Sequence, residues 1–159
     1  MPWSATWKQE PPMATNPPRA YVRRMVRATA AHIFNAWTVP SEMAHWMTPV
    51  GHARAEVDLQ VGGRFRLVMA DEHLSIEHTG EYRVIEPPNL LIFTWRSEFT
   101  GMRDTLVTVR LTERSASETE LEVIHELDTA EQAASHAEGW NHIVSRLETF
   151  LDSTGVDAR

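Results

Sequence analysis

The sequence has no cysteine among its 159 residues. Disulfide bonds, thiolate metal sites and cysteine nucleophiles are therefore excluded, and the chain suits a reducing compartment. It also has no apolar run near the roughly 20 residues that a membrane-spanning helix needs. The first residues lack the basic-then-apolar order of a secretory signal peptide. We therefore expect a cytoplasmic protein with no membrane partner.

Positive charge is scarce relative to negative charge. The sequence has 15 lysine and arginine residues against 22 aspartate and glutamate residues, which gives a formal net charge of −7. Such a balance favours solubility and disfavours binding to the phosphate backbone of a nucleic acid. The hydrophobic fraction of 42% is ordinary for a globular protein, and the length suits one domain with a sizeable core. We expect a single domain with no nucleic-acid partner.

Sequence motifs for several kinds of chemistry are missing. There is no Gly-x-Ser-x-Gly nucleophile motif, phosphate-binding loop or dinucleotide-binding motif, and no helix is expected after Gly62-Gly63. The eight histidines include no His-x-x-x-His pair and no His-Glu-x-x-His motif. His136 and His142 are six residues apart, which places them on different faces of a helix. The sequence thus predicts no metal site and no cofactor.

Residues 1–18 differ from the rest of the chain in composition. They contain five of the nine prolines and show neither the helix period nor the strand period. We expect an extended N-terminal tail. Its tryptophans, Trp3 and Trp7, either pack locally on the domain or form a docking arm for a neighbouring subunit, so a homodimer is an open possibility.

Residues 19–152 show the alternating patterns of one folded domain, and residues 153–159 are expected to form a C-terminal tail. Thr29 is expected to cap a helix over Ala30–Thr38, which Pro40 ends, and Ser41 to cap a short helix over Glu42–Trp46. Seven strands are predicted, with turns at hairpin spacing that indicate an antiparallel sheet. They are Tyr21–Arg27, Ala53–Val57, Arg64–Ala70, Leu74–Ile85, Leu90–Ser97, Thr105–Leu111 and Thr119–Leu127.

The long C-terminal helix is the most regular part of the pattern. Asp128 is expected to cap it, with Glu131 as its capping partner. One face carries an apolar stripe formed by Ala133, Ala137, Trp140, Val144, Leu147 and Leu151. A strand, two helices, six strands and this helix predict an α+β fold, in which a curved antiparallel sheet wraps around the helix.

Alternation also predicts which strand residues face the helix. The inward set includes Phe65, Leu67 and Met69 of one strand and His125 of the last strand. In the long strand predicted over Leu74–Ile85, the residues expected to face inward are Ile76, His78, Gly80, Tyr82 and Val84. Because Ala133 and Ala137 are small residues on the stripe that carries Trp140, we expect a void near the N-terminal half of the helix, with His136 at its border.

Three segments carry a resemblance to a known family. They are Val57–Arg66 with its Asp58 and Gly62-Gly63, Gly80–Trp95 with its Pro87-Pro88, and Gly139-Trp140. In this order they resemble the activator of heat shock protein 90 ATPase homologue family, within the START-like (SRPBCC) superfamily, over about residues 19–152. The resemblance implies the helix-grip fold. Most single-domain relatives look like small-molecule binders or proteins without an assigned role.

The leading hypothesis is a non-catalytic domain that binds a small hydrophobic or amphipathic molecule between the sheet and the C-terminal helix. The expected ligand-binding residues are Trp37, Trp46, Phe65, His78, Tyr82, Trp95, His125, His136 and Trp140. Plain core packing, with each histidine merely hydrogen-bonded, is the competing interpretation of these residues.

Two other functions stay open. One is a chaperone-associated or stress-related interaction module, in which the outer surface matters and a chaperone is the partner. The other is an enzyme of the polyketide cyclase or hydrolase type, in which a cavity histidine acts as acid or base together with Tyr82.

Overall fold

The structure is a computed structural model that describes residues 16–157, with side chains described for residues 16–154. Its elements follow the predicted order of a strand, two helices, six strands and a long helix. Trp3, Trp7 and most of the predicted N-terminal tail lie outside the described residues. Pro18 is described, and its carbonyl accepts a hydrogen bond from Leu127 N at 2.8 Å.

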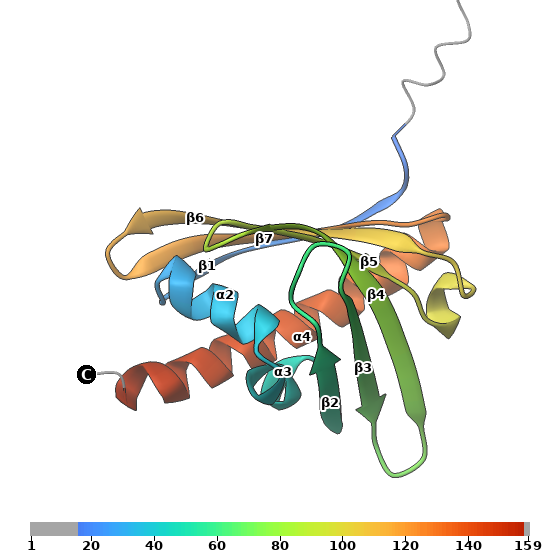
Figure 1. Cartoon of the computed structure of the whole chain (residues 1–159), viewed down its shortest axis with the longest axis horizontal. Helices are drawn as coiled ribbons and strands as arrows, with labels where there is room; N and C mark the ends of the chain where they lie inside the picture. Colours follow the sequence, from blue (N-terminus) through green and yellow to red (C-terminus); the bar gives the residue numbers. More distant parts are fainter. Residues whose placement is uncertain (1–15, 158–159) are drawn as a thin grey trace, which may run out of the picture.

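One antiparallel sheet contains all seven named strands, in the order β1-β7-β6-β5-β4-β3-β2. Strands β2 to β7 form a meander, and β1 lies beside β7 at the edge of the sheet. Figure 1 shows that the sheet curves around the long helix. The strands are β1 (Arg19–Val26), β2 (His52–Val57), β3 (Arg64–Ala70), β4 (Ser75–Glu86), β5 (Leu90–Trp95), β6 (Thr105–Ser115) and β7 (Glu118–Glu126).

The helices lie on the inner side of this curve. Helix α4 (Ala130–Asp157) crosses the sheet, and α2 (Ala30–Thr38) and α3 (Pro40–Trp46) lie alongside it (Figure 1). A short 3₁₀ helix, η2 (Glu98–Thr100), lies between β5 and β6. Helix α4 continues past residue 152, so the predicted tail at 153–159 begins inside it. Within residues 16–157, no helix combines the length and apolar character that crossing a membrane requires.

The predicted apolar stripe of α4 forms the centre of the core. Trp140, Val144, Leu147 and Leu151 are buried, and they pack with the inner face of the sheet in one hydrophobic cluster. Trp37 of α2 joins them, with its ring centroid 5.9 Å from that of Trp140. Burying this face against the sheet is what holds a 28-residue helix in place, because helix propensity alone contributes little.

Two predicted helix caps were wrong by one or two residues. Helix α3 begins at Pro40 rather than after Ser41, and its preceding residue Val39 makes no side-chain cap. Proline fits the first turn of a helix because its φ is already helical and its missing N–H would have no partner there. At α4 the cap is Thr129, whose Oγ1 accepts from Gln132 N at 3.1 Å, instead of Asp128.

The predicted face of Val84 was also wrong. The pairing of β4 with β5 shifts register between Tyr82 and Val84, as at a β-bulge. The extra residue reverses the alternation, so Ile85 packs against the core and Val84 does not. Up to Tyr82 the prediction was confirmed, since Ile76, His78 and Tyr82 are all buried.

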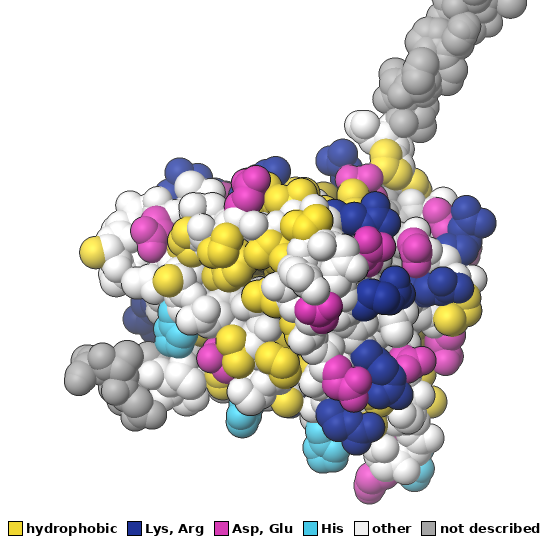
Figure 2. All heavy atoms as spheres, viewed as in Figure 1, with side chains coloured by type: hydrophobic (Ala, Val, Ile, Leu, Met, Phe, Trp, Pro, Cys, Tyr) yellow, Lys and Arg dark blue, Asp and Glu magenta, His cyan; other side chains and the backbone are white. Residues whose placement is uncertain are grey.

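The outer face of the sheet is covered by paired charges. Arg66 of β3 pairs with Glu77 of β4, and Arg23 of β1 pairs with Glu120 of β7. Figure 2 shows side chains of both signs interspersed over the region of β3 and β4. Interspersed charges suit contact with water, so this outer face is a solvated surface.

Candidate functional site

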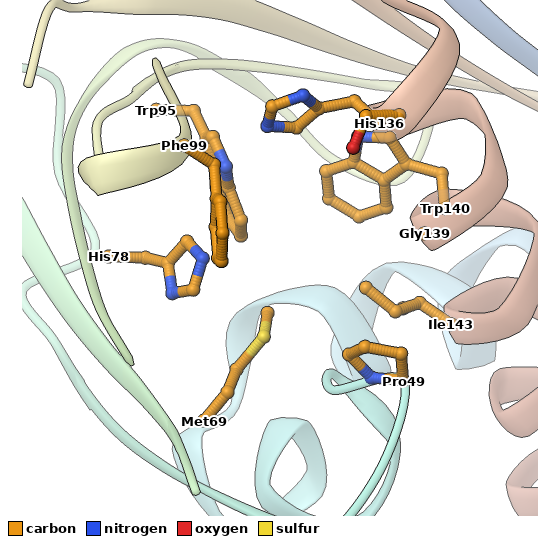
Figure 3. A pocket seen from close by; sticks show the side chains of 10 residues that line it. Pro49, Met69, His78, Trp95, Phe99, His136, Gly139, Trp140 and Ile143 are labelled. Carbon is orange, nitrogen blue, oxygen red and sulfur yellow. The ribbon is translucent and has the colours of Figure 1, made fainter. Parts of the chain in front are cut away.

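A pocket of about 210 Å³ lies between the N-terminal half of α4 and strands β3, β4 and β5 (Figure 3). The loop between α3 and β2 and the 3₁₀ helix η2 complete its wall. The side chains around it are mostly apolar or aromatic, and none is lysine, arginine, aspartate or glutamate. They are Pro49, Met69, His78, Trp95, Phe99, Ser135, His136, Gly139, Trp140 and Ile143.

A second pocket of about 160 Å³ continues the first toward the turn between β3 and β4. Both pockets are lined by Pro49, Met69, His78 and Phe99, so they form one groove. Its single acidic lining residue is Asp71.

The rim of this groove is apolar as well. Val50, Leu74 and Phe99 are all exposed there. The carboxylate of Asp71 is occupied locally, because its Oδ1 accepts from the N–H groups of His73 and Leu74, both at 2.8 Å. No lysine or arginine lies along the groove lining, so a negatively charged ligand group finds no ionic partner there.

His136 presents a hydrogen-bond acceptor at the end of the pocket that α4 forms. Its Nδ1 lies 2.8 Å from the carbonyl oxygen of Gln132, one turn earlier in the helix. A carbonyl only accepts, so Nδ1 carries the hydrogen and Nε2 of the neutral ring carries a lone pair. Burial lowers the pKa of His136, which favours this neutral form. Figure 3 shows the ring extending from α4 toward Trp95.

His78 and Trp95 form the opposite wall and carry polar atoms without partners. His78 is only 4% exposed, and its ring centroid lies 4.7 Å from that of Trp95. Among the described residues, neither His78 Nδ1 nor Trp95 Nε1 has a hydrogen-bond partner. Burial lowers the pKa of His78 to about 4, so this imidazole is neutral near pH 7. Unpartnered buried polar atoms are uncommon and each calls for a reason.

His125 lies behind the pocket and has both ring nitrogens occupied. Trp140 Nε1 donates to its Nδ1 at 3.0 Å, because an indole N–H can only donate. Thr105 Oγ1 donates to the carbonyl of Trp95 at 2.6 Å, so it accepts from His125 Nε2 at 2.7 Å. This chain of hydrogen bonds fixes the neutral tautomer of His125. Burial lowers its pKa to about 2.

The histidines of this region do not form a metal site in the described part of the chain. No group of three or more histidine, aspartate or glutamate side chains there could hold a metal ion. The site therefore offers neutral imidazoles and indoles, which recognise a ligand by shape and hydrogen bonding.

The sequence of residues 27–152 matches the family described as Activator of Hsp90 ATPase homolog 1-like protein. The chain belongs to this family. A comparison with curated proteins gives no match.

Solved structures that are similar to this chain share its START-like helix-grip fold. A protein from Nitrosomonas europaea has 20% sequence identity and a TM-score of 0.73, over 87% of this chain and 97% of its own. A protein from Rhodobacter sphaeroides has 25% identity and a TM-score of 0.73, over 86% and 93%. DynU16, described as a putative protein in the dynemicin biosynthetic locus, has 22% identity and a TM-score of 0.70, over 86% of this chain and 48% of its own.

In this family member, the residues expected from the sequence separate into three groups. His78, Trp95, His136 and Trp140 line the 210 Å³ pocket. His125 supports Trp140 from behind. The remaining four lie deeper in the core. Trp37, Phe65 and Tyr82 line a much smaller void of about 10 Å³, and Trp46 packs against Trp37 with their ring centroids 4.8 Å apart. Burial raises the pKa of Tyr82 well above its usual range, so its hydroxyl stays protonated.

The residues that leave room for the pocket differ from those predicted. It lies by the N-terminal half of α4 with His136 at its edge, but Gly139 and Ser135 leave it open, while Ala133 and Ala137 do not line it. Sequence reasoning also missed Phe99 and Pro49, which come from loops with no periodic signal. Met69 could have been found, because alternation already placed it on the inner face of its strand.

Proposed function

We propose that this protein binds a small, neutral and largely apolar molecule in the groove between α4 and strands β3 to β5. The observation that carries the proposal is an aromatic-walled pocket of about 210 Å³, at the edge of a core that is otherwise closely packed. Packed interiors contain few voids larger than a water molecule. Concave, mostly apolar pockets with a few polar groups are typical of ligand sites.

The volume of the pocket limits the size of the ligand. A dry engineered cavity of about 150 Å³ takes up benzene. The pocket of about 210 Å³ thus suits one or two fused rings, and the adjoining pocket of about 160 Å³ gives room for a substituent. The exposed apolar rim at Val50, Leu74 and Phe99 gives such a molecule a path from water.

Binding without catalysis is the simpler use of these residues. A histidine that acts as a general base works best with a pKa near the working pH. Burial lowers the pKa of both His78 and His136, and no carboxylate lines the pocket to orient them. The neutral imidazoles are better suited to hydrogen bonding than to proton transfer.

Gly139 offers a clean test. A Cβ added at Gly139 meets no atom within 4 Å, so a larger side chain can enter the pocket without a clash. Replacing a helical glycine also removes a penalty of about 1 kcal/mol. Gly139→Leu should therefore keep or raise the free energy of unfolding while it blocks the pocket. The readout is fluorescence titration with N-phenyl-1-naphthylamine, a neutral apolar probe.

Gly139→Ala is the matched control. It gains the same helix propensity but fills little of the pocket, so it should bind the probe nearly as wild type does. We expect Gly139→Leu to lose at least about tenfold in affinity, the loss of roughly 1.4 kcal/mol. The proposal is overturned if the wild-type protein shows no saturable response to this probe or to other neutral aromatic compounds. It is also overturned if Gly139→Leu binds as tightly as wild type.

A further inference from the structure

We infer that the ligand is a neutral aromatic molecule with a hydroxyl group, of the phenol or naphthol class, whose hydroxyl donates a hydrogen bond to Nε2 of His136. This inference rests on the proposed binding function and adds the chemical class of the ligand. It rests on the direction of the hydrogen bonds around His125 and His136, together with the aromatic and uncharged lining of the pocket.

The hydrogen bond within α4 fixes which nitrogen of His136 donates and which accepts. Because Nδ1 donates to the carbonyl of Gln132 at 2.8 Å, the neutral ring offers an acceptor at Nε2. The contact lies within α4 itself, so it does not depend on the ligand. A ligand that approaches this nitrogen gains most if it brings a hydrogen-bond donor. An ether, a ketone or a bare hydrocarbon brings none.

The neighbouring histidine, His125, does not compete with His136 for a polar group of the ligand. The ring centroids of His125 and His136 are 4.8 Å apart. Both nitrogens of His125 are already bonded, to Trp140 and to Thr105. His136 is therefore the histidine of this pair that can form a hydrogen bond with a polar group of the ligand.

The walls of the pocket are largely aromatic. The rings of Trp95 and Trp140 lie 5.2 Å apart at an interplanar angle of 50°, and His78 lies against Trp95 on the other side. Aromatic faces and edges favour aromatic partners in offset or edge-to-face contact.

The uncharged lining of the pocket selects against an acidic ligand. No lysine or arginine lines the pocket, and burial keeps both of its histidines neutral. A carboxylate that leaves water for such a site loses hydration without gaining an ionic partner. Aromatic alcohols should therefore bind better than aromatic acids of the same size.

Isothermal titration calorimetry with three matched naphthalenes tests the inference. The compounds are 2-naphthol, 2-methoxynaphthalene, which lacks the donor, and 2-naphthoate, which is an anion. We expect wild type to bind 2-naphthol roughly three- to tenfold more tightly than 2-methoxynaphthalene, the range of one neutral hydrogen bond. We expect 2-naphthoate to bind more weakly than both.

Two variants assign the preference to His136. His136→Phe and His136→Leu remove the acceptor and keep an apolar side chain, so both should bind the naphthol and its methyl ether equally. His142→Phe, an exposed position on the same helix, is the control and should keep the preference. Thermal unfolding checks that each variant is folded.

The outcomes separate this inference from the proposed function. If wild type binds 2-naphthol and 2-methoxynaphthalene equally, or prefers 2-naphthoate, the ligand class is wrong while binding itself stands. If the preference for the naphthol survives in both His136 variants, the assignment to His136 is wrong. If none of the three compounds binds, the proposed function fails together with the inference.

Discussion

His125 illustrates how hydrogen-bond direction can decide what a residue does. A buried histidine beside a pocket is a natural candidate for a catalytic base. In this protein, however, Trp140 donates to its Nδ1, and its Nε2 donates to Thr105. A proton on Nδ1 would face the indole N–H of Trp140. His125 therefore positions the pocket wall and links α4 to strands β5, β6 and β7.

We predict that His125→Phe destabilises the protein although phenylalanine is close to histidine in shape. The change leaves the buried N–H of Trp140 without an acceptor, which costs about 1–3 kcal/mol. Urea unfolding followed by tryptophan fluorescence gives the change in the free energy of unfolding. His52→Phe, at an exposed position of β2, is the control. A loss below about 0.5 kcal/mol, as at neutral surface sites, would contradict the role given to His125.

At the scale of elements, the two glycines in the turn between β2 and β3 have different structural roles. Gly62 has a φ of +87°, and a Cβ there would meet no atom within 4 Å. Gly63 has no such φ, but a Cβ there would lie 2.2 Å from the carbonyl oxygen of Asp58. The turn is fastened to β4, because Gly62 N donates to the carbonyl of Tyr82 and Tyr82 N donates to that of Gly63, at 2.8 and 2.9 Å.

This difference predicts an order of stability. Gly62→Ala should cost about 1–2 kcal/mol, the penalty for a left-handed backbone. Gly63→Ala should cost more, because a backbone oxygen must move and the bonds to Tyr82 move with it. Gly101→Ala, at a φ of +67° and also in open space, should match Gly62→Ala. Denaturant titration ranks the three variants, and a Gly63→Ala variant as stable as Gly62→Ala would show that the turn is looser than described.

For the whole molecule, the fold followed from periodicity but its irregular points did not. The inner face of β3, the inward position of His125 in β7 and the stripe of α4 were confirmed, because burial of one face imposes a simple repeat on the residues. The bulge at Tyr82 and Val84 breaks that repeat without a marker in the sequence. At the start of α4, Asp128 and Thr129 are both good capping residues, and the backbone geometry decides between them.

The site was less accessible to sequence reasoning than the fold. Periodicity placed Phe65 and Trp140 inside, and both are buried, as are Trp37 and Trp95. Which of them borders empty space depends on how α4 tilts over the sheet and on loop residues such as Phe99, which have no periodic signal. Gly139 was visible in the sequence as part of a family motif, and its role as the open side of the pocket became clear only from the packing around it.

The same buried histidines make the stability of the whole molecule depend on pH. Burial lowers the pKa of His78 to about 4 and that of His125 to about 2, whereas an unfolded histidine has a pKa near 6.5. As the pH falls through 6.5, the unfolded chain binds protons that the folded chain does not. The free energy of unfolding therefore falls with falling pH, and the full stability is present only above about pH 6.5.

Acidic residues cause a further loss of stability at lower pH. Hydrogen bonds from Arg23 and Arg114 lower the pKa of Glu120 to about 2, from an ordinary value of 4.5. Its stabilising contribution is present above pH 4.5 and is lost as the pH falls toward 2. The window from pH 6.5 to 4.5 thus reports mainly on the histidines.

We predict that the free energy of unfolding drops across this window by on the order of 2 kcal/mol for each of His78 and His125. His78→Phe removes one titrating ring, so its stability should fall less steeply between pH 6.5 and 4.5 than that of wild type. Ile143→Val, a buried change without a titrating group, should lower stability by about 1 kcal/mol at every pH and keep the wild-type slope. Urea unfolding at half-unit steps of pH measures all three. If His78→Phe and wild type lose stability in parallel, His78 is protonated in the folded protein and the pocket is more polar than its lining indicates.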